Sequence, residues 1–105
     1  MATSSDLSLE EVDKRLTILH SNLLELSDTC GRLVKTTQYE FEFMSLAQAY
    51  HDEAMTLAKM MNDSPDTRYA ALKSTLRNMQ TIRSEANMAV ISELDRASKG
   101  SLKTW

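Results

Sequence analysis

The sequence predicts an all-α protein, a helical hairpin of two long helices with coiled-coil character that assembles into an intermolecular helical bundle. Three observations predict this fold class. The chain of 105 residues contains only two Gly and one Pro, so few residues interrupt a helix. Most of its 42% hydrophobic residues are Leu, Ala and Met, whereas 6% of residues are aromatic, and this balance favours helices over strands. Apolar residues also recur in alternating steps of three and four.

The first helix is expected to begin at Ser8. Glu11 follows Ser8 by three residues, and Leu9 and Val12 open the apolar series. This is the capping-box pattern, in which the serine oxygen accepts from an early backbone N–H and the glutamate reaches back. Residues 1–7 are small and polar, and we expect them to form an N-terminal tail.

Two heptad series follow along the predicted first helix. The first contains Leu9, Val12, Leu16, Leu19, Leu23, Leu26, Cys30 and Leu33, and the second contains Phe43, Ala47, Tyr50, Ala54, Leu57 and Met61. Such a repeat is typical of a coiled-coil seam. The two registers do not join across Thr36–Glu42, which indicates either a change of coiled-coil pitch or a face that turns toward another partner. We expect one helix over residues 8–62, about 80 Å long, with Gly31 as a weak point.

The second helix is expected to span residues 65–98. A turn over residues 62–65 precedes it, where Ser64 suits the N-cap, Pro65 suits the first helical position and Asp66 favours the positive end of the helix dipole. Lys99 and Gly100 after Ser98 resemble a C-terminal stop, so residues 99–105 form a predicted tail. Residues 8–98 then make one domain.

The unequal lengths of the two helices predict an intermolecular contact. Joined by a short turn, the second helix lies antiparallel to the first and covers only part of it. The leucine-rich stretch near the start of the first helix is left without an internal partner, and such a stripe does not normally stay in water. We therefore predict that other helical chains, as a homodimer or a heteromeric bundle, bind to Val12, Leu16, Leu19, Leu23, Leu26 and Leu33.

The methionines allow two interpretations. Most of them lie at or near the predicted apolar faces: Met44, Met55, Met60, Met61, Met79 and Met88. Flexible Met side chains suit an adaptable surface for partners, but they more often fill a core, and we favour the second interpretation.

The sequence shows no constellation of catalytic or metal-binding residues. His20 and His51 are far apart, and Gln48 occupies the position where a di-iron bundle would need a glutamate before His51. Cys30 falls on the apolar seam, about 15 Å along the helix from His20, so the pair is not suited to nucleophilic catalysis. No glycine-rich phosphate loop is present. We expect no enzymatic activity, no cofactor and no metal.

Charge is divided unevenly along the chain. The net charge is −3, but residues 1–65 contain five Lys/Arg and eleven Asp/Glu, whereas residues 66–105 contain seven and four. The basic residues of the second half are Arg68, Lys73, Arg77, Arg83, Arg96, Lys99 and Lys103. We expect them to pair with the acidic side chains Glu40, Glu42, Asp52 and Glu53, although they also suit an acidic lipid surface. Aromatic residues for base stacking are missing among them, so nucleic acid is not an expected partner.

Two features predict a location in the cytoplasm, with the nucleus as the alternative. Cys30 is the single cysteine and has no partner for an internal disulfide, which is typical of a reducing compartment. No apolar run approaches the roughly 18 residues needed to cross a bilayer, and no signal peptide is visible.

Part of the pattern resembles the opening helices of a BAR-type membrane-curvature domain. The residues that carry this resemblance are Leu33-Val34-Lys35 through Leu46-Ala47, the break at 63–66, and the series Leu72, Leu76, Ile82, Val90, Leu94 and Leu102-Lys103. The resemblance covers at most half of such a module and implies binding to acidic lipid. Our first prediction is a non-enzymatic protein–protein interaction subunit, a scaffold or adaptor, and the BAR-like membrane-associated module is the alternative.

Overall fold

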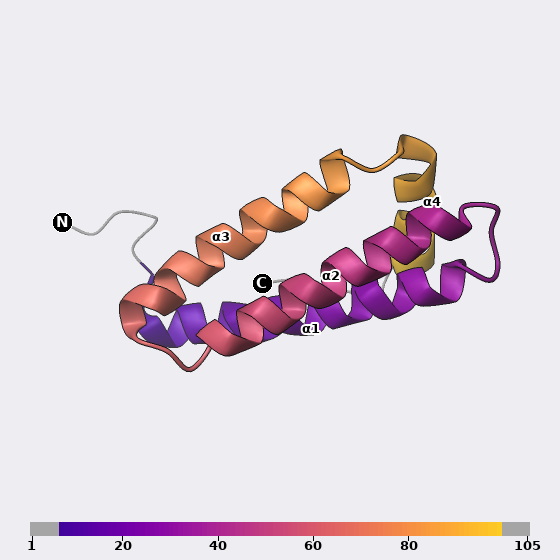
Figure 1. Ribbon diagram of the computed structural model, residues 1–105. Helices are drawn as coiled ribbons and strands as arrows, with labels where there is room; N and C mark the ends of the chain where they lie inside the picture. Colours follow the sequence, from indigo (N-terminus) through magenta and orange to yellow (C-terminus); the bar gives the residue numbers. More distant parts are fainter. Residues whose placement is uncertain (1–6, 100–105) are drawn as a thin grey trace.

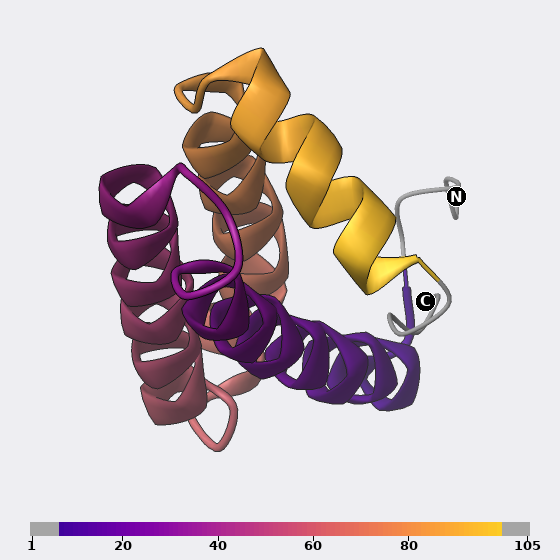
Figure 2. The same cartoon turned by 90° about the vertical axis from the view of Figure 1, so that its right-hand side faces the viewer.

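The computed structural model describes residues 7–99, and this part of the chain forms four helices. They are α1 (Leu9–Leu33), α2 (Glu40–Met60), α3 (Pro65–Ser84) and α4 (Met88–Ser98). Helices α1 and α2 lie side by side and antiparallel, and α3 reverses direction again after the turn at the end of α2 (Figure 1). The shorter α4 crosses one end of this group instead of running parallel to it (Figures 1 and 2). Helix α1 contacts all three of the others.

The predicted first helix over residues 8–62 is wrong, because the chain turns back between Leu33 and Glu40. Thr37 supplies the physical reason. Its hydroxyl donates to the Leu33 carbonyl at 2.9 Å and accepts from the Tyr39 N–H at 3.2 Å. Such local bonds compete with the helical backbone bonds, so a threonine breaks the helix without Gly or Pro. The turn lies where the two heptad registers fail to join, whereas Gly31 stays inside α1 and faces open space where a side chain would begin.

The predicted second helix over residues 65–98 is also interrupted, at Glu85–Asn87. The Asn87 side-chain oxygen accepts from the Ala89 N–H at 2.8 Å and so caps a new helix, α4. Asparagine is among the best N-cap residues, because its oxygen satisfies an N–H that has no partner within the helix. The two-helix hairpin of the sequence prediction is therefore corrected to four helices, and the longest extent of the molecule is 51 Å.

The helix starts at Leu9 and Pro65 are confirmed. The Ser8 hydroxyl accepts from the Glu11 N–H at 3.1 Å, and the Ser64 hydroxyl accepts from the Thr67 N–H at 3.3 Å. The predicted tails, residues 1–7 and 99–105, lie almost wholly outside the described residues. Leu7 is within them, and its carbonyl accepts from the Tyr69 hydroxyl at 2.6 Å.

One hydrophobic core joins the four helices. Its largest fully buried apolar side chains are Phe43, Leu16, Leu19, Leu23, Leu57, Leu94, Val12 and Val90. Each fully buried side chain of this size contributes roughly 1.5–3 kcal/mol. Polar contacts link the helices around the core. Arg68 of α3 donates to both carboxylate oxygens of Asp13 in α1 at 2.9 Å, and Ser27 of α1 donates to the Ala47 carbonyl of α2 at 2.8 Å.

None of the helices within residues 7–99 is both long enough and apolar enough to span a bilayer.

Candidate interaction site

The six residues predicted to bind a partner lie in the core of their own chain. Val12, Leu16, Leu19 and Leu23 are at most 1% exposed and Leu26 is 7% exposed, while Leu33 is partly buried against the same core. The turn after α1 is the reason, because it folds α2 back over the stripe that a straight helix would leave uncovered. Another chain reaches these side chains only if the helices separate. Their role in partner binding stays a prediction.

The residues considered for chemistry are not brought together. Cys30 is fully buried, and desolvation raises the pKa of its thiol to about 12, so the reactive thiolate is suppressed. His51 is exposed on α2, whereas His20 is partly buried on α1. Across the described residues, no three His, Cys, Asp or Glu side chains gather closely enough to hold a metal ion.

The basic side chains of α3 and α4 pair differently from the expectation. Arg68 pairs with Asp13 of α1, Arg83 with Asp95 of α4, and Arg96 with Glu93 one turn away. The acidic residues expected to pair with these cations make other contacts or none. Asp52 accepts a hydrogen bond from Gln48, Glu53 accepts one from Asn78, and Glu40 and Glu42 are exposed. Lys73 and Arg77 are exposed on α3 and have no ion pair within residues 7–99.

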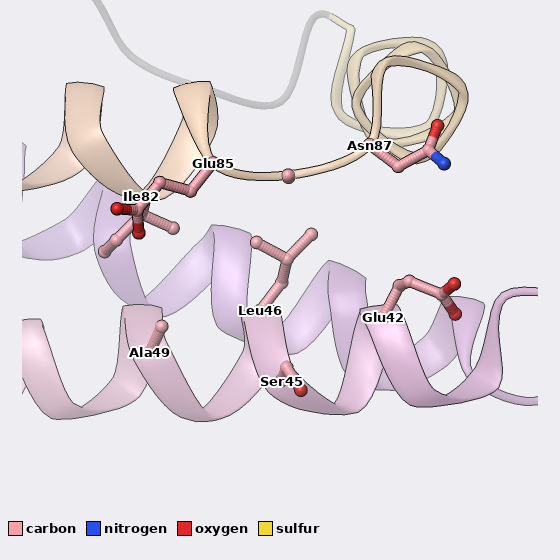
Figure 3. Close-up of a pocket in the computed structure, with 8 residues that line it drawn as sticks. Glu42, Ser45, Leu46, Ala49, Ile82, Glu85 and Asn87 are labelled. Carbon is pink, nitrogen blue, oxygen red and sulfur yellow. The ribbon is translucent and has the colours of Figure 1, made fainter.

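A groove of about 310 Å³ opens between α2 and the turn that joins α3 to α4. Figure 3 shows Leu46 pointing from α2 into this groove, toward the end of α3 where Ile82 lies. Small side chains widen the space at Ser45, Ala49 and Ala86. The floor is therefore largely apolar, and it is lined from α2 and from the end of α3, which the turn after Met60 folds back beside α2.

Two carboxylates stand at the ends of this groove. Glu42 lies at the end near Asn87, and Glu85 reaches down beside Ile82 at the other end (Figure 3). The Asn87 oxygen is engaged in capping α4, which leaves the carboxylates as the charged groups of the lining. The site thus combines an apolar floor with negative charge at both ends.

The two most exposed large apolar side chains of the described chain lie next to this groove. Phe41 is 82% exposed and precedes Glu42, and Met88 is 85% exposed and follows Asn87. Phe41 also lies one helical turn before Ser45, so the two side chains are neighbours on α2. Met44, 53% exposed, continues the outward face of α2 one turn after Phe41.

A second groove of about 460 Å³ extends the same surface along α4. It shares Ala86 with the first groove and is lined further on by Met88 and Ile91. We use the name interaction surface for the first groove together with Phe41, Met44 and Met88. Sequence reasoning missed this surface because it depends on the turn at Glu85–Asn87. One signal was present: Phe41 and Met44 are apolar but fall outside the heptad series of α2.

The chain matches no known protein family, no curated protein and no solved structure.

Proposed function

We propose that this protein is a non-enzymatic protein–protein interaction subunit, which assembles with other helical chains as a homo-oligomer or as part of a multisubunit complex. The observation that carries the proposal is the position of Phe41 and Met88. They are far apart in the sequence, yet they flank one groove and are the most exposed large apolar residues described.

The position of both residues, each next in sequence to a residue that lines the same groove, supports the proposal more than their exposure does. Single exposed apolar residues are common on soluble proteins, whereas a contiguous apolar patch with a polar rim is typical of an interface. Phenylalanine and methionine are also among the residues enriched at interfaces. Burying Phe41 against a partner would contribute roughly 1.5–3 kcal/mol.

Helix α2 supports the proposal in a second way. Phe43, Leu46, Tyr50, Ala54 and Leu57 are buried on its inner side, whereas Phe41, Met44 and Met55 are exposed on its outer side. A surface helix normally carries one apolar stripe, and a helix that is apolar on more than one side is usually covered on more than one side. A partner chain on the outer side would supply that second cover.

The buried thiol of Cys30 supports a non-enzymatic role and a reducing compartment. The thiol is inert in the core, and burial raises its pKa to about 12. A single cysteine kept as a free thiol is usual in the cytoplasm or nucleus, which is where we place the protein.

The membrane-associated alternative rests on Lys73 and Arg77. These exposed residues are one turn apart on α3, and cations near an anionic membrane each add about 1 kcal/mol of attraction. Two cations are few for stable membrane binding, and the interaction surface itself carries carboxylates. Co-sedimentation with vesicles of acidic phospholipid that is lost in Lys73→Gln/Arg77→Gln would favour this alternative.

The proposal is tested by placing a photo-crosslinking phenylalanine analogue at position 41 in cells that express the protein. We expect one discrete adduct, with a second copy or with one other protein, that also forms from position 88. The matched control carries the analogue at Lys14, which is exposed near the start of α1 and does not line the groove. Absence of a discrete adduct at position 41, or the same adducts at all three positions, would contradict the proposal.

A further inference from the structure

The first groove offers negative charge at two places. Glu42 marks one end, and Glu85 stands at the other end beside Ile82, across the groove from Ala49 of α2 (Figure 3). Glu42 and Ala49 are seven residues apart on one helix, which corresponds to about 10 Å along its axis. Leu46 lies between them and points into the groove.

Neither carboxylate is neutralised within the described chain. Glu42 and Glu85 have no ion pair and no side-chain hydrogen bond to any residue of 7–99. Arg83 is only two residues from Glu85, but both of its terminal nitrogens donate to Asp95, at 2.8 and 2.6 Å. An apolar floor with an unpaired anion at each end is complementary to an apolar group that carries a cation on each side.

We propose that the first groove binds a basic amphipathic segment of a partner protein. An apolar side chain of the partner packs on Leu46 and Ile82, and a Lys or Arg on each side reaches Glu42 and Glu85. The inference rests on the proposed interaction function and adds the chemical class of the partner.

The spacing defines the segment further. On a partner helix, residues i and i+7 are about 10 Å apart and share a face, so the cations belong at these two positions and the apolar residues at i+3 and i+4. The groove volume of about 310 Å³ is at the lower end of ligand pockets, which suits one or two side chains and excludes a whole helix. The partner helix therefore lies over the mouth of the groove, along the line between Glu42 and Glu85, and inserts its apolar side chains.

A second copy of this chain fits the groove less well. Its exposed cations without an ion pair in the described chain include no two that are seven residues apart on one helix, and the two on α3, Lys73 and Arg77, span only about 6 Å. The others are Lys14, Lys35, Lys59 and Lys99. Leu76, the apolar residue between Lys73 and Arg77, faces inward and is partly buried against the core. Charge and spacing together favour a different protein as the occupant.

The probe is a synthetic helical peptide of about 18 residues on an alanine background, long enough to be helical alone. It carries Lys at i and i+7 and Leu at i+3 and i+4. Binding of the fluorescein-labelled peptide to the full chain is measured by fluorescence anisotropy. The control peptide has Gln at both Lys positions. We expect the Lys peptide to bind more tightly than the Gln peptide and to weaken as NaCl is added.

Charge reversal in the protein locates the binding. In Glu42→Lys/Glu85→Lys, the affinity for the Lys peptide should fall about tenfold, and a peptide with Glu at i and i+7 should gain affinity. Glu10→Lys, an exposed acidic residue at the far start of α1, should change affinity by less than about twofold. Circular dichroism confirms that each variant is folded.

Three results of the peptide experiments would overturn the inference. These are no saturable binding up to about 1 mM peptide, equal binding of the Lys and Gln peptides, or unchanged affinity in the double variant. A crosslink from position 41 to a second copy would also overturn it, since the occupant would then be the chain itself. If the crosslinks to another protein persist while the peptide results fail, the proposed function stands and only the partner class is wrong.

Discussion

At the scale of single residues, four buried side-chain atoms of the described chain have no hydrogen-bond partner, and one of them belongs to a fully buried residue. Thr75 of α3 is fully buried, and its hydroxyl has no hydrogen-bond partner among the described residues. The other buried hydroxyls in the core are bonded: Ser98 donates to the Leu94 carbonyl, and Thr29 accepts from Arg32. An unpaired buried hydroxyl costs about 1–3 kcal/mol, because it loses its bonds to water and gains none in exchange.

We therefore predict that Thr75→Val stabilises the protein. Valine keeps the branched shape and removes the unpaired hydroxyl, so the free energy of unfolding should rise by about 1 kcal/mol. Urea denaturation followed by circular dichroism measures the change. Thr17→Val is the matched control, since the exposed Thr17 hydroxyl donates to the Asp13 carbonyl, and it should give no gain. A loss of stability in Thr75→Val would show that this hydroxyl is bonded.

At the scale of helices, the sequence predicted the outer limits of the two expected helices but missed the break inside each of them. Ser8 and Ser64 were recognised because each is an N-cap residue before an apolar series, and both accept the expected N–H. The breaks at Thr37 and Asn87 were missed because neither contains Gly or Pro. Both use side-chain bonds to the backbone, and the same residues are tolerated within helices elsewhere, so their effect depends on context.

The core and the interaction surface differ in how much the sequence reveals of them. Leu16, Leu19 and Leu23 were predicted to be apolar contacts, and that property follows from heptad spacing alone. Which helix covers them depends on where the chain runs after Leu33, and the apolar periodicity of a helix does not predict this. The groove brings α2 beside Glu85–Asn87, so it depends on the break after α3, which the sequence did not predict.

Helix α4 is short, and its link to α3 is electrostatic and pH-dependent. The Arg83 guanidinium of α3 donates two hydrogen bonds to the Asp95 carboxyl of α4 and holds the pKa of that carboxyl below its usual range. Because the pKa is lower in the folded protein, the pair stabilises the fold above the unfolded value of about 3.9, and this contribution is lost as pH falls through the folded pKa. Both side chains are about half exposed, so the contribution is small.

We predict that Asp95→Asn lowers the free energy of unfolding by about 1 kcal/mol or less at pH 7. The difference from the unmodified protein should become smaller near pH 2, because the Asp95 carboxyl is progressively protonated as pH falls through its lowered pKa. Urea denaturation at the two pH values measures it. Glu53→Gln is the control, because Glu53 accepts from the uncharged side chain of Asn78, a bond that glutamine can also accept. An equal loss at both pH values would contradict the electrostatic origin.

At the scale of the whole molecule, Cys30 reports whether the four helices stay together. Cys30 lies on α1 within the apolar series and is fully buried. Tyr50 of α2 is also buried and is close enough to Cys30 for the two groups to interact electrostatically. Burial raises the pKa of both groups to about 12. A reagent can therefore reach the thiol only when α1 and α2 separate.

We predict that the native protein reacts with iodoacetamide about a thousandfold or more slowly than the chain unfolded in urea, given usual domain stabilities. Mass spectrometry of the alkylated protein over time measures the rate. Rapid alkylation in native buffer would instead mean that the α1–α2 contact opens readily. The predicted partner contacts on α1 would then become accessible.

The short turns between successive helices have a consequence for how the chain folds. Helices α1 and α2, and then α2 and α3, pack against the neighbour that follows them directly in sequence. Only small loops must close to form these contacts, so the entropy lost before the first native contacts is small. Helical proteins with such local contacts fold in microseconds to milliseconds. The leucines of α1 are thus exposed only briefly after synthesis, which leaves little time for them to aggregate.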